Sequence, residues 1–258
     1  MRHRDAPSPY ARHASPRPPL SKETMKMKNK VLGSLAMAGV LAASASAQAH
    51  IAAVAPTAIA GKTLLVELGV GHGCEGADTY AITVDIPKGM TSVRPMESDF
   101  GKTSLTYDAV DTALVTSVTW QKDEADALPK DTNYYKIAFR AKLPAAPFTS
   151  IYYKIHQVCR AADATLSYAE WVALPGEMGE PAAAQALVPD HLPGWNKFTV
   201  PADIPDLSIY FKDALIVWRG SDAYSFNDAT VELIKGTQGV NLLSADGVKA
   251  NDEIWVRY

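Results

Sequence analysis

The sequence predicts an all-β protein, a two-sheet β-sandwich with one disulfide, followed by a small C-terminal α+β extension. The clearest observation is the stretch 135–143, in which the odd positions are apolar and mostly polar side chains stand between them. A period of two is typical of a strand with one buried face. About seven short segments of this kind, separated by turns, favour a sandwich. Two cysteines, Cys74 and Cys159, stand far apart in the chain.

The segments with strand character are rich in β-branched and aromatic residues. In chain order they are residues 63–69, 81–86, 105–110, 113–120, 135–143, 151–159 and 166–174. Their number and spacing are typical of an immunoglobulin- or cupredoxin-like sandwich. The glycine-rich stretch 69–76 and the polar stretch 121–131 are expected to be loops.

Residues 1–49 are expected to be a signal peptide, whose true start is Met25 or Met27. A basic stretch at residues 26–30 precedes an apolar stretch at residues 31–43. This order of charge and hydropathy is typical of a leader that directs export. The sequence therefore predicts a periplasmic or secreted protein.

The leader ends in Ala47-Gln48-Ala49-His50, which fits a signal-peptidase site with small residues at the first and third positions. A cut after Ala49 makes His50 the first residue of the mature chain. His50 then carries a free α-amine beside its own imidazole, and these two nitrogens can chelate one metal ion.

The charge of the mature chain excludes one class of partner. Residues 1–49 hold 8 of the 25 Lys and Arg and 2 of the 28 Asp and Glu. The remainder holds 17 basic and 26 acidic residues, a formal net charge of −9. Such an acidic chain argues against nucleic-acid binding and favours a cation as ligand. No later apolar run is long enough to span a bilayer, so no membrane span is expected after the leader.

The two cysteines have two interpretations. An even pair in an exported protein predicts one disulfide between Cys74 and Cys159. The alternative is a pair of thiolates on a soft metal such as Cu(I). The absence of a Cys-x-x-Cys spacing makes the disulfide the favoured interpretation.

The chain divides into a sandwich at residues 50–185 and an extension at residues 186–258 whose role the sequence does not indicate. Residues 177–193 are rich in acids and prolines and are expected to form a linker or an edge strand. The extension is expected to contain a short helix at residues 227–235, capped by Asn227 or Asp228 and ended by Gly236. A hairpin of residues 240–243 and 254–258 is expected to close the chain.

Several motifs together resemble the YcnI-like family of exported bacterial domains. They are His50 after the leader, His72-Gly73-Cys74-Glu75-Gly76, Val84-Asp85-Ile86-Pro87-Lys88-Gly89, Val118-Thr119-Trp120, the stretch 134–144, and Gln157-Val158-Cys159 leading to Trp171. The resemblance covers roughly residues 50–185. It implies a β-sandwich that binds one Cu(II) ion through an N-terminal histidine brace, with a glutamate and a tryptophan beside the metal.

Carried over by position, the histidine is His50 and the tryptophan is Trp171, with Trp120 as the alternative. The glutamate is not at its expected position, where the sequence has Lys136. A lysine there would repel a cation. Glu170 and Asp131 are the carboxylates nearest in the sequence, and Glu170 is the candidate we carry forward.

The chemistry of His50 supports copper independently of the resemblance. Two nitrogens with a carboxylate or water suit tetragonal Cu(II), which also has the highest affinity among the divalent first-row metals. The α-amine, with an ordinary pKa of about 7.7–8.0, must lose a proton before it binds. Copper binding should therefore weaken as the pH falls below neutral. His72, between glycines and beside Cys74, is a further candidate ligand; the alternative is a loop histidine that packs near the disulfide.

The sequence therefore predicts a Cu(II) chaperone or buffer rather than an enzyme. Its expected partners are the copper ion and a copper-transporting membrane protein or a cuproenzyme. One alternative is an oxidative enzyme, in which His72 or His156 supplies a second imidazole; the sequence shows no aromatic row for a polysaccharide substrate. The other alternative is a metal-free adhesion or scaffold sandwich.

Overall fold

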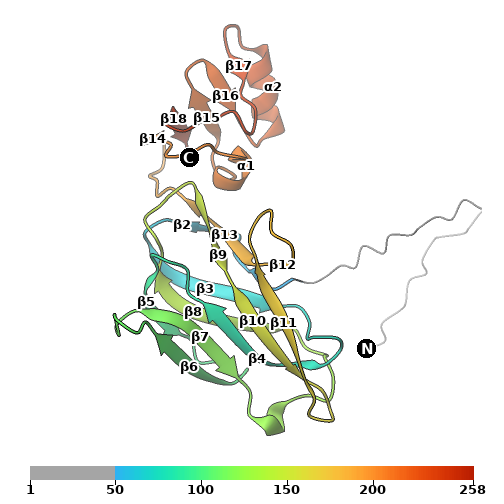
Figure 1. Ribbon diagram of the computed structural model, residues 1–258. Helices are drawn as coiled ribbons and strands as arrows, with labels where there is room; N and C mark the ends of the chain where they lie inside the picture. The colour runs from blue at the N-terminus through green and yellow to red at the C-terminus, as the bar shows by residue number, and fades with distance from the viewer. Residues whose placement is uncertain (1–49) are drawn as a thin grey trace, which may run out of the picture. The chain divides into compact units, whose positions relative to one another are not determined.

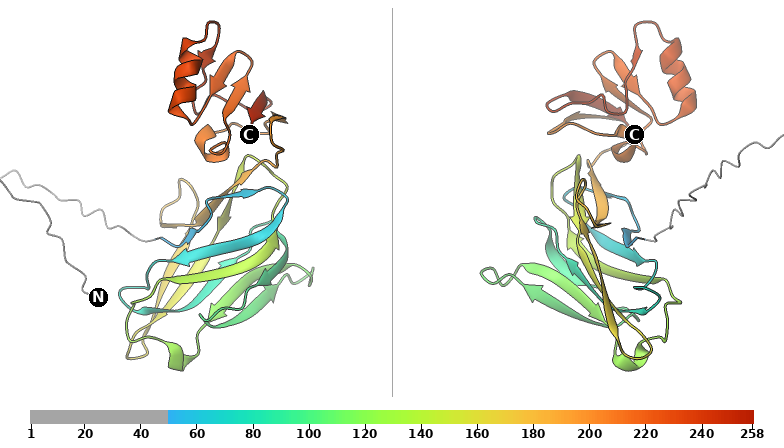
Figure 2. Two further views of the ribbon diagram at one scale, coloured as in Figure 1. Left: turned by 180° about the vertical axis from the view of Figure 1, so that it is seen from behind. Right: turned by 45° about the vertical axis from the view of Figure 1, so that its right-hand side comes forward.

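The computed structural model describes residues 50–258, so the expected signal peptide lies outside the described residues. Two sheets face each other in the first part of this region (Figures 1 and 2). In spatial order the first holds β1 (Ala52–Ala53), β3 (Thr63–Val70), β8 (Tyr135–Lys142) and β5 (Thr91–Pro95). The second holds β12 (Glu180–Pro181), β11 (Leu166–Ala173), β10 (Ile155–Arg160), β4 (Asp78–Asp85), β7 (Val115–Gln121) and β6 (Lys102–Tyr107). The all-β sandwich predicted from the sequence is confirmed.

The core of the sandwich lies between these sheets and follows the period of two. In β8, Ile137, Phe139 and Ala141 are fully buried, whereas the lysines and arginine between them are exposed. Trp120 on β7 is also fully buried, and its ring lies 6.4 Å from that of Phe139. Trp120 is therefore a core residue.

One disulfide joins Cys74 to Cys159, as expected, with a Cα–Cα distance of 5.6 Å. Cys74 lies between β3 and β4, and Cys159 lies on β10. The bridge spans 85 positions of sequence. Closing so long a loop is expected to stabilise the fold by about 4 to 5 kcal/mol in an entropic account.

The single strand expected at residues 151–159 is two strands in different sheets. β9 (Thr149–Tyr153) pairs with β13 (Ala183–Val188), and β10 begins at Ile155 after a break at Lys154. β13 also pairs with β2 (Thr57–Ile59), which makes a small third sheet. The alternation continues through the break because both halves bury one face.

The stretch 177–193, expected to be a linker or an edge strand, contains an edge strand, β12, and a central strand, β13. Within it, β13 lies between β2 and β9, and Ala183, Gln185 and Leu187 are buried. Gln185 accepts a hydrogen bond from the Tyr153 hydroxyl at 2.8 Å and donates one to the carbonyl of Ala55 at 2.9 Å. β13 runs across the boundary expected at residues 185 and 186, and that boundary stays a prediction.

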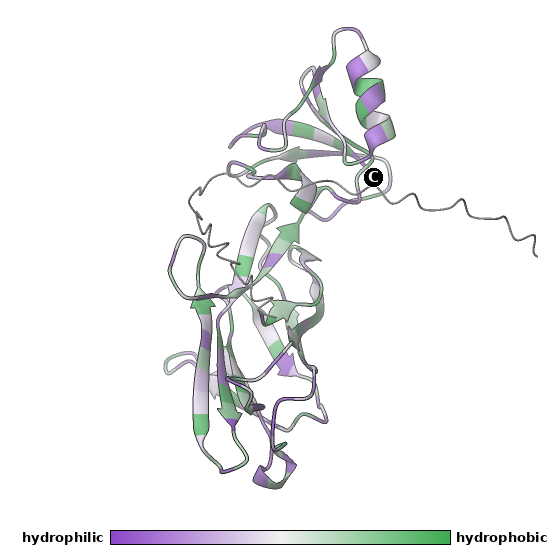
Figure 3. Cartoon of the chain, turned by 90° about the vertical axis from the view of Figure 1, so that its right-hand side faces the viewer, coloured by the Kyte–Doolittle hydropathy of each residue, from purple (hydrophilic) through white to green (hydrophobic). Residues whose placement is uncertain are grey.

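The C-terminal module has a sheet and two helices of its own. Its strands, in spatial order, are β14 (Trp195–Thr199), β18 (Glu253–Arg257), β15 (Ile216–Arg219), β16 (Asp222–Tyr224) and β17 (Asn241–Leu242). The helices are α1 (Leu207–Tyr210) and α2 (Asp228–Gly236). As expected, Asn227 caps α2, and its side chain accepts a hydrogen bond from the Thr230 amide. Polar and apolar residues alternate around α2 (Figure 3).

The closing hairpin expected at residues 240–258 does not form. β17 pairs in parallel with β16, and β18 lies between β14 and β15. β18 is therefore a central strand, and its residues Ile254 and Val256 are fully buried on one face. Among the described residues no helix is long and apolar enough to cross a membrane.

Candidate metal centre

Trp171 is the fixed point around which the candidate site is built. It lies on β11 opposite Ile155 of β10, and only 3% of it is exposed. Its indole nitrogen donates a hydrogen bond to Oε1 of Gln157 at 2.9 Å. The burial and the hydrogen bond together hold the ring in one orientation.

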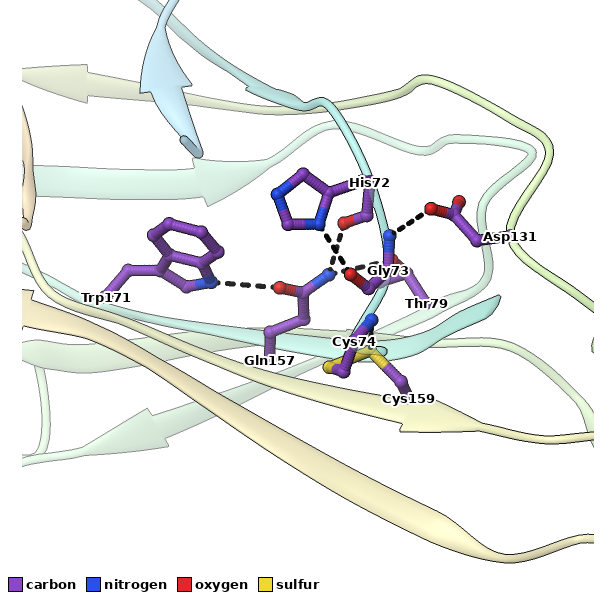
Figure 4. The surroundings of a disulfide bond; sticks show 8 residues. All are labelled: His72, Gly73, Cys74, Thr79, Asp131, Gln157, Cys159 and Trp171. Carbon is purple, nitrogen blue, oxygen red and sulfur yellow. Dashed lines mark hydrogen bonds between the residues drawn. A yellow bond between two sulfur atoms is a disulfide. The ribbon is translucent and has the colours of Figure 1, made fainter. Parts of the chain in front are cut away.

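Gln157 connects Trp171 to the loop that carries His72 (Figure 4). Its amide nitrogen donates to the carbonyl of His72 and to the hydroxyl of Thr79, both at 2.8 Å. Gln157 is 1% exposed, so each of these hydrogen bonds replaces one that water would make. A shift of the loop would therefore disturb the hydrogen bond that orients the indole of Trp171.

His50 lies beside the indole of Trp171. The two ring centroids are 5.7 Å apart, with the ring planes at 79°. Nδ1 of His50 lies 3.6 Å from Oε2 of Glu180. The side chains of His50 and Glu180 are 44% and 38% exposed, so the site opens to solvent.

Glu180 is the residue that sequence reasoning missed. It lies on β12, a two-residue strand that pairs in parallel with β11 and places Glu180 opposite Trp171. The chain returns to Trp171 through a turn in which Gly176 and Gly179 adopt positive φ angles of 88° and 122°. Glycine tolerates these angles without strain. A strand this short has no periodicity, so only its glycine-rich approach could have indicated the turn.

His72 lies beside the same indole. Its ring centroid is 5.9 Å from that of Trp171, with the planes at 64°. Its Nδ1 lies 2.5 Å from the carbonyl oxygen of Gly73, so Nδ1 carries the proton and donates. This tautomer leaves Nε2 with a free lone pair, which is the arrangement that metal-binding histidines commonly have.

Two hydrogen bonds and one close backbone contact fix the loop that carries His72. The Gly73 amide donates to a carboxylate oxygen of Asp131 at 2.7 Å, and the Cys74 amide donates to Sγ of Cys159 at 2.8 Å. A Cβ at Gly73 would lie 1.8 Å from the carbonyl oxygen of Ala77, so only glycine fits there. Asp131, considered as a ligand from the sequence, instead supports this loop.

Glu170 lies on the other face of β11 from Trp171, because successive residues of a strand point to opposite faces. It hydrogen-bonds Nδ1 of His156, its cross-strand partner. Nε2 of His156 lies 3.4 Å from a carboxylate oxygen of Asp85. Burial lowers the pKa of His156, but the hydrogen bonds and charges of Glu170 and Asp85 outweigh it and raise the pKa above its ordinary value. The structure therefore does not bring Glu170 to His50.

Lys136, at the position where the resemblance predicts the glutamate, forms an ion pair with Glu67. Lys136 lies on β8, opposite Gly69 of β3. Its Nζ is 2.9 Å from a carboxylate oxygen of Glu67. The hydrogen bond and the charge of Glu67 raise the pKa of Lys136. The carboxylate that lies near His50 is on a different strand and belongs to Glu180.

His50 and His72 each lie beside the indole of Trp171, and Glu180 lies beside His50. Two imidazoles and a carboxylate are ligands for borderline metal ions such as Cu(II) and Zn(II). Within residues 50–258 no cluster of three or more His, Cys, Asp and Glu side chains is placed to hold a metal ion. A site built here from His50 and Glu180 therefore needs a further donor.

The two facing sheets, with a bridge between β10 and the β3–β4 loop, make this part of the described chain a β-sandwich with one disulfide. Residues 50–187 match the family model described as "Domain of unknown function (DUF1775)". That match covers more than half of the chain, so the chain belongs to the DUF1775 family. No curated protein matches the chain.

Two solved structures are similar to the chain at low identity. One is an uncharacterized protein from Nocardia farcinica with an immunoglobulin-like fold. It is 23% identical at a TM-score of 0.44, and the match covers 54% of this chain and 97% of that one. The other is BcpA*(D312A), the major pilin subunit of Bacillus cereus. It is 8% identical at a TM-score of 0.30, and the match covers 80% of this chain and 51% of that one.

Proposed function

We propose that the chain is exported, is cut before His50, and binds one Cu(II) ion there as a periplasmic or secreted copper chaperone or buffer. The observation that carries the proposal is the position of His50, whose imidazole lies near both the indole of Trp171 and the carboxylate of Glu180. The α-amine that the cut would free belongs to the same residue. It would be the further donor that the side chains alone do not provide.

The distance from Nδ1 of His50 to Oε2 of Glu180 fits two ligands of one ion. At 3.6 Å it is too long for a hydrogen bond. It is shorter than two metal–ligand bonds of about 2.0–2.2 Å laid end to end. The distance therefore allows one ion to bond to both atoms without a change in their separation.

The indole of Trp171 would shape the site rather than bind the metal. Its nitrogen already donates to Gln157, and an indole N–H is a donor only. The buried ring forms a rigid apolar wall beside His50. Such a wall limits the access of water to one side of the ion, while the exposed side stays open for a partner.

Hand-over is the activity that this arrangement favours. His50 lies at the expected start of the mature chain and is half exposed. A terminal ligand can leave the metal without disturbing any strand. A copper-transporting membrane protein or a cuproenzyme could therefore take the ion by ligand exchange.

The test is a competition titration of Cu(II) against the chain that begins at His50, with its mass confirmed. We expect tight one-to-one binding that weakens below about pH 7, because the α-amine has an ordinary pKa of about 7.7–8.0. His50→Ala and a chain that retains Ala49 before His50 should each lose most of the affinity. Glu180→Gln should weaken binding while preserving the stoichiometry.

The matched control is Glu170→Gln, which removes a carboxylate from the same strand region but from the other face. It should bind Cu(II) like the unaltered chain. Equal affinity in the chain that retains Ala49 would refute the terminal chelate. No Cu(II) binding by any form would favour the metal-free adhesion or scaffold alternative.

A second candidate function, an oxidative enzyme, is favoured by His72 beside the same indole. Its free Nε2 could serve a metal held at His50 as a further ligand. Oxygen consumption by the copper-loaded chain in the presence of ascorbate would support this candidate if His72→Ala abolished it. Unchanged Cu(II) affinity in His72→Ala, with oxygen consumption no faster than that of free copper, would favour the chaperone.

A further inference from the structure

Three tryptophans of the C-terminal module lie on one face of its sheet. Trp195 is on β14, Trp255 on β18 and Trp218 on β15, and these strands are neighbours in that order. Trp218 and Trp255 are direct cross-strand partners, so their Cβ atoms lie about 5 Å apart. Trp195 pairs with Arg257, which places it diagonal to Trp255 on the same face. The indoles therefore form a row across three strands, which we term the tryptophan row.

The tryptophan row is not needed for the core of the module. Val217, Ile254 and Val256 point to the other face and are buried there. Trp195 and Trp255 are 52% and 48% exposed. Together with Trp218 and Gly220 they line a shallow depression of about 540 Å³. Contiguous exposed apolar surface is a common feature of interaction sites.

The charged groups beside the row are largely balanced. Lys197, opposite Trp255, lies 2.7 Å from a carboxylate oxygen of Glu253, and its Nζ is 5.9 Å from the indole of Trp255. Arg257, which lies opposite Trp195, adds one positive charge on this face. The face therefore carries two cations and one anion, an excess too small to select a strongly anionic ligand.

The chemistry of the face fits a sugar chain. The C–H face of a pyranose ring is apolar and packs flat on an indole, whereas its hydroxyl groups point outward from the ring edge. Lys197, Glu253 and Arg257 lie on the same face as the indoles and offer both donors and an acceptor at the ring edge. A row of flat aromatic rings with polar groups at its edge is complementary to a flat, extended chain of sugars.

We propose that the tryptophan row binds a neutral β-1,4-linked polysaccharide. The inference corrects the expectation from the sequence, in which no aromatic row could be recognised. It uses no residue of the sandwich, so it is independent of the proposal for copper. A C-terminal module with this property would hold the exported chain on a glycan surface.

The experiment uses the chain from His50 to Tyr258 and three soluble probes: cellohexaose, chitohexaose and the α-linked maltohexaose. Binding is measured by calorimetric titration and by the fluorescence of tryptophan. We expect one of the two β-linked hexaoses to bind with saturation and maltohexaose to bind much more weakly. Trp255→Ala and Trp218→Ala should each weaken binding about ten-fold or more.

Two variants separate loss of binding from loss of folding. Trp255→Tyr keeps an aromatic ring and should retain most of the affinity. Leu233→Ala removes an exposed apolar side chain from α2, outside the tryptophan row, and should bind like the unaltered chain. Unchanged circular dichroism in Trp255→Ala would show that the module remains folded.

Three results would overturn the proposal. The first is the absence of saturable binding by both β-linked hexaoses. The second is equal affinity in Trp255→Ala and the unaltered chain. The third is a dimer in size-exclusion chromatography that Trp255→Ala dissolves, because the row would then be an interface between two copies of the chain.

Discussion

The sandwich and the C-terminal module hold tryptophan in opposite ways. Trp171 is almost fully buried, and its indole nitrogen donates to Gln157. Trp255 is about half exposed and lies beside an ion pair at the surface. The first indole is positioned by a network that reaches the disulfide loop, so distant changes should move it. The indole of Trp255 stands on a strand whose opposite face packs in the core of the module. It can therefore bind a ligand without a loss of core packing.

The two regions also differ in how they hold lysine: Lys122 of the sandwich is buried, whereas Lys197 of the C-terminal module is exposed. This contrast predicts the largest difference in the free energy of unfolding. Lys122 is 5% exposed, and its Nζ contacts Asp78 at 2.5 Å and the Tyr135 hydroxyl at 2.7 Å. Burial first, and then the hydrogen bond and charge of Asp78, raise the pKa of Tyr135, which therefore stays neutral and hydrogen-bonds both partners. Lys122→Met leaves Asp78 buried without its cation and should lower the free energy of unfolding by about 3–5 kcal/mol.

The matched control for Lys122→Met is Lys197→Met, which removes the surface partner of Glu253. It should change the free energy of unfolding by less than about 1 kcal/mol. Urea unfolding followed by circular dichroism measures both variants. Equal losses in the two would show that the buried cluster contributes no more than a surface pair.

Replacement of the two indoles by alanine is the next largest contrast. Trp171→Ala removes a buried ring and the partner of Gln157, so a loss of about 3–5 kcal/mol in the free energy of unfolding is expected. Trp255→Ala should cost about 1 kcal/mol or less, because much of its ring is already exposed. Thermal and urea unfolding of the two variants side by side would measure the difference. A comparable loss in Trp255→Ala would mean that the tryptophan row is part of the structural core.

The sandwich could be predicted from the sequence because its strands bury one face. The alternation in residues 135–143 is β8 with its inward residues correctly identified. The disulfide was predictable from the even number of cysteines together with the expected export of the chain. The break at Lys154 was not, because β9 and β10 both continue the same alternation while they enter different sheets.

The candidate site and the tryptophan row depend on strand order, which alternation does not encode. Glu180 reaches Trp171 through a two-residue parallel strand, too short to leave a pattern in the sequence. Trp195 and Trp255 stand far apart in the chain and meet because β18 lies beside β14. The closing hairpin expected at residues 240–258 would have occupied one edge of β18, whereas in the structure β14 and β15 occupy both edges.

The connection between Trp171 and the His72 loop predicts an effect of intermediate size. Gln157→Leu leaves the indole nitrogen and the Thr79 hydroxyl without their buried partner. Each unsatisfied group costs about 1–3 kcal/mol, so the free energy of unfolding should fall by at least that amount. Gln121→Leu, which loses only an exposed hydrogen bond to the Tyr80 hydroxyl, is the matched control and should have little effect. Equal stability of the two variants, measured by urea unfolding, would contradict the role assigned to Gln157.

The smallest expected effect concerns the pair of His156 and Glu170, on the outer face of the strands that position Trp171. Since the pKa of folded His156 is raised above the ordinary value of about 6.5, protonation stabilises the fold. The contribution is complete below the pKa of the unfolded chain and disappears as the pH rises through the raised value. His156 is 40% exposed, so the contribution should stay below about 1 kcal/mol.

Glu170→Gln tests this contribution and the separation of the two faces in one variant. The pKa of His156, followed by NMR of its ring, should fall because a raising partner is removed. The stability difference between the unaltered chain and Glu170→Gln should be largest near about pH 5–6, where a histidine is protonated while carboxylates are generally still ionised, and should vanish at alkaline pH. Cu(II) affinity should be unchanged, because Glu170 and Trp171 point to opposite faces of β11. A lower Cu(II) affinity in Glu170→Gln would mean that the outer pair and the His50 site are coupled, and the contrast between the two faces would then fail.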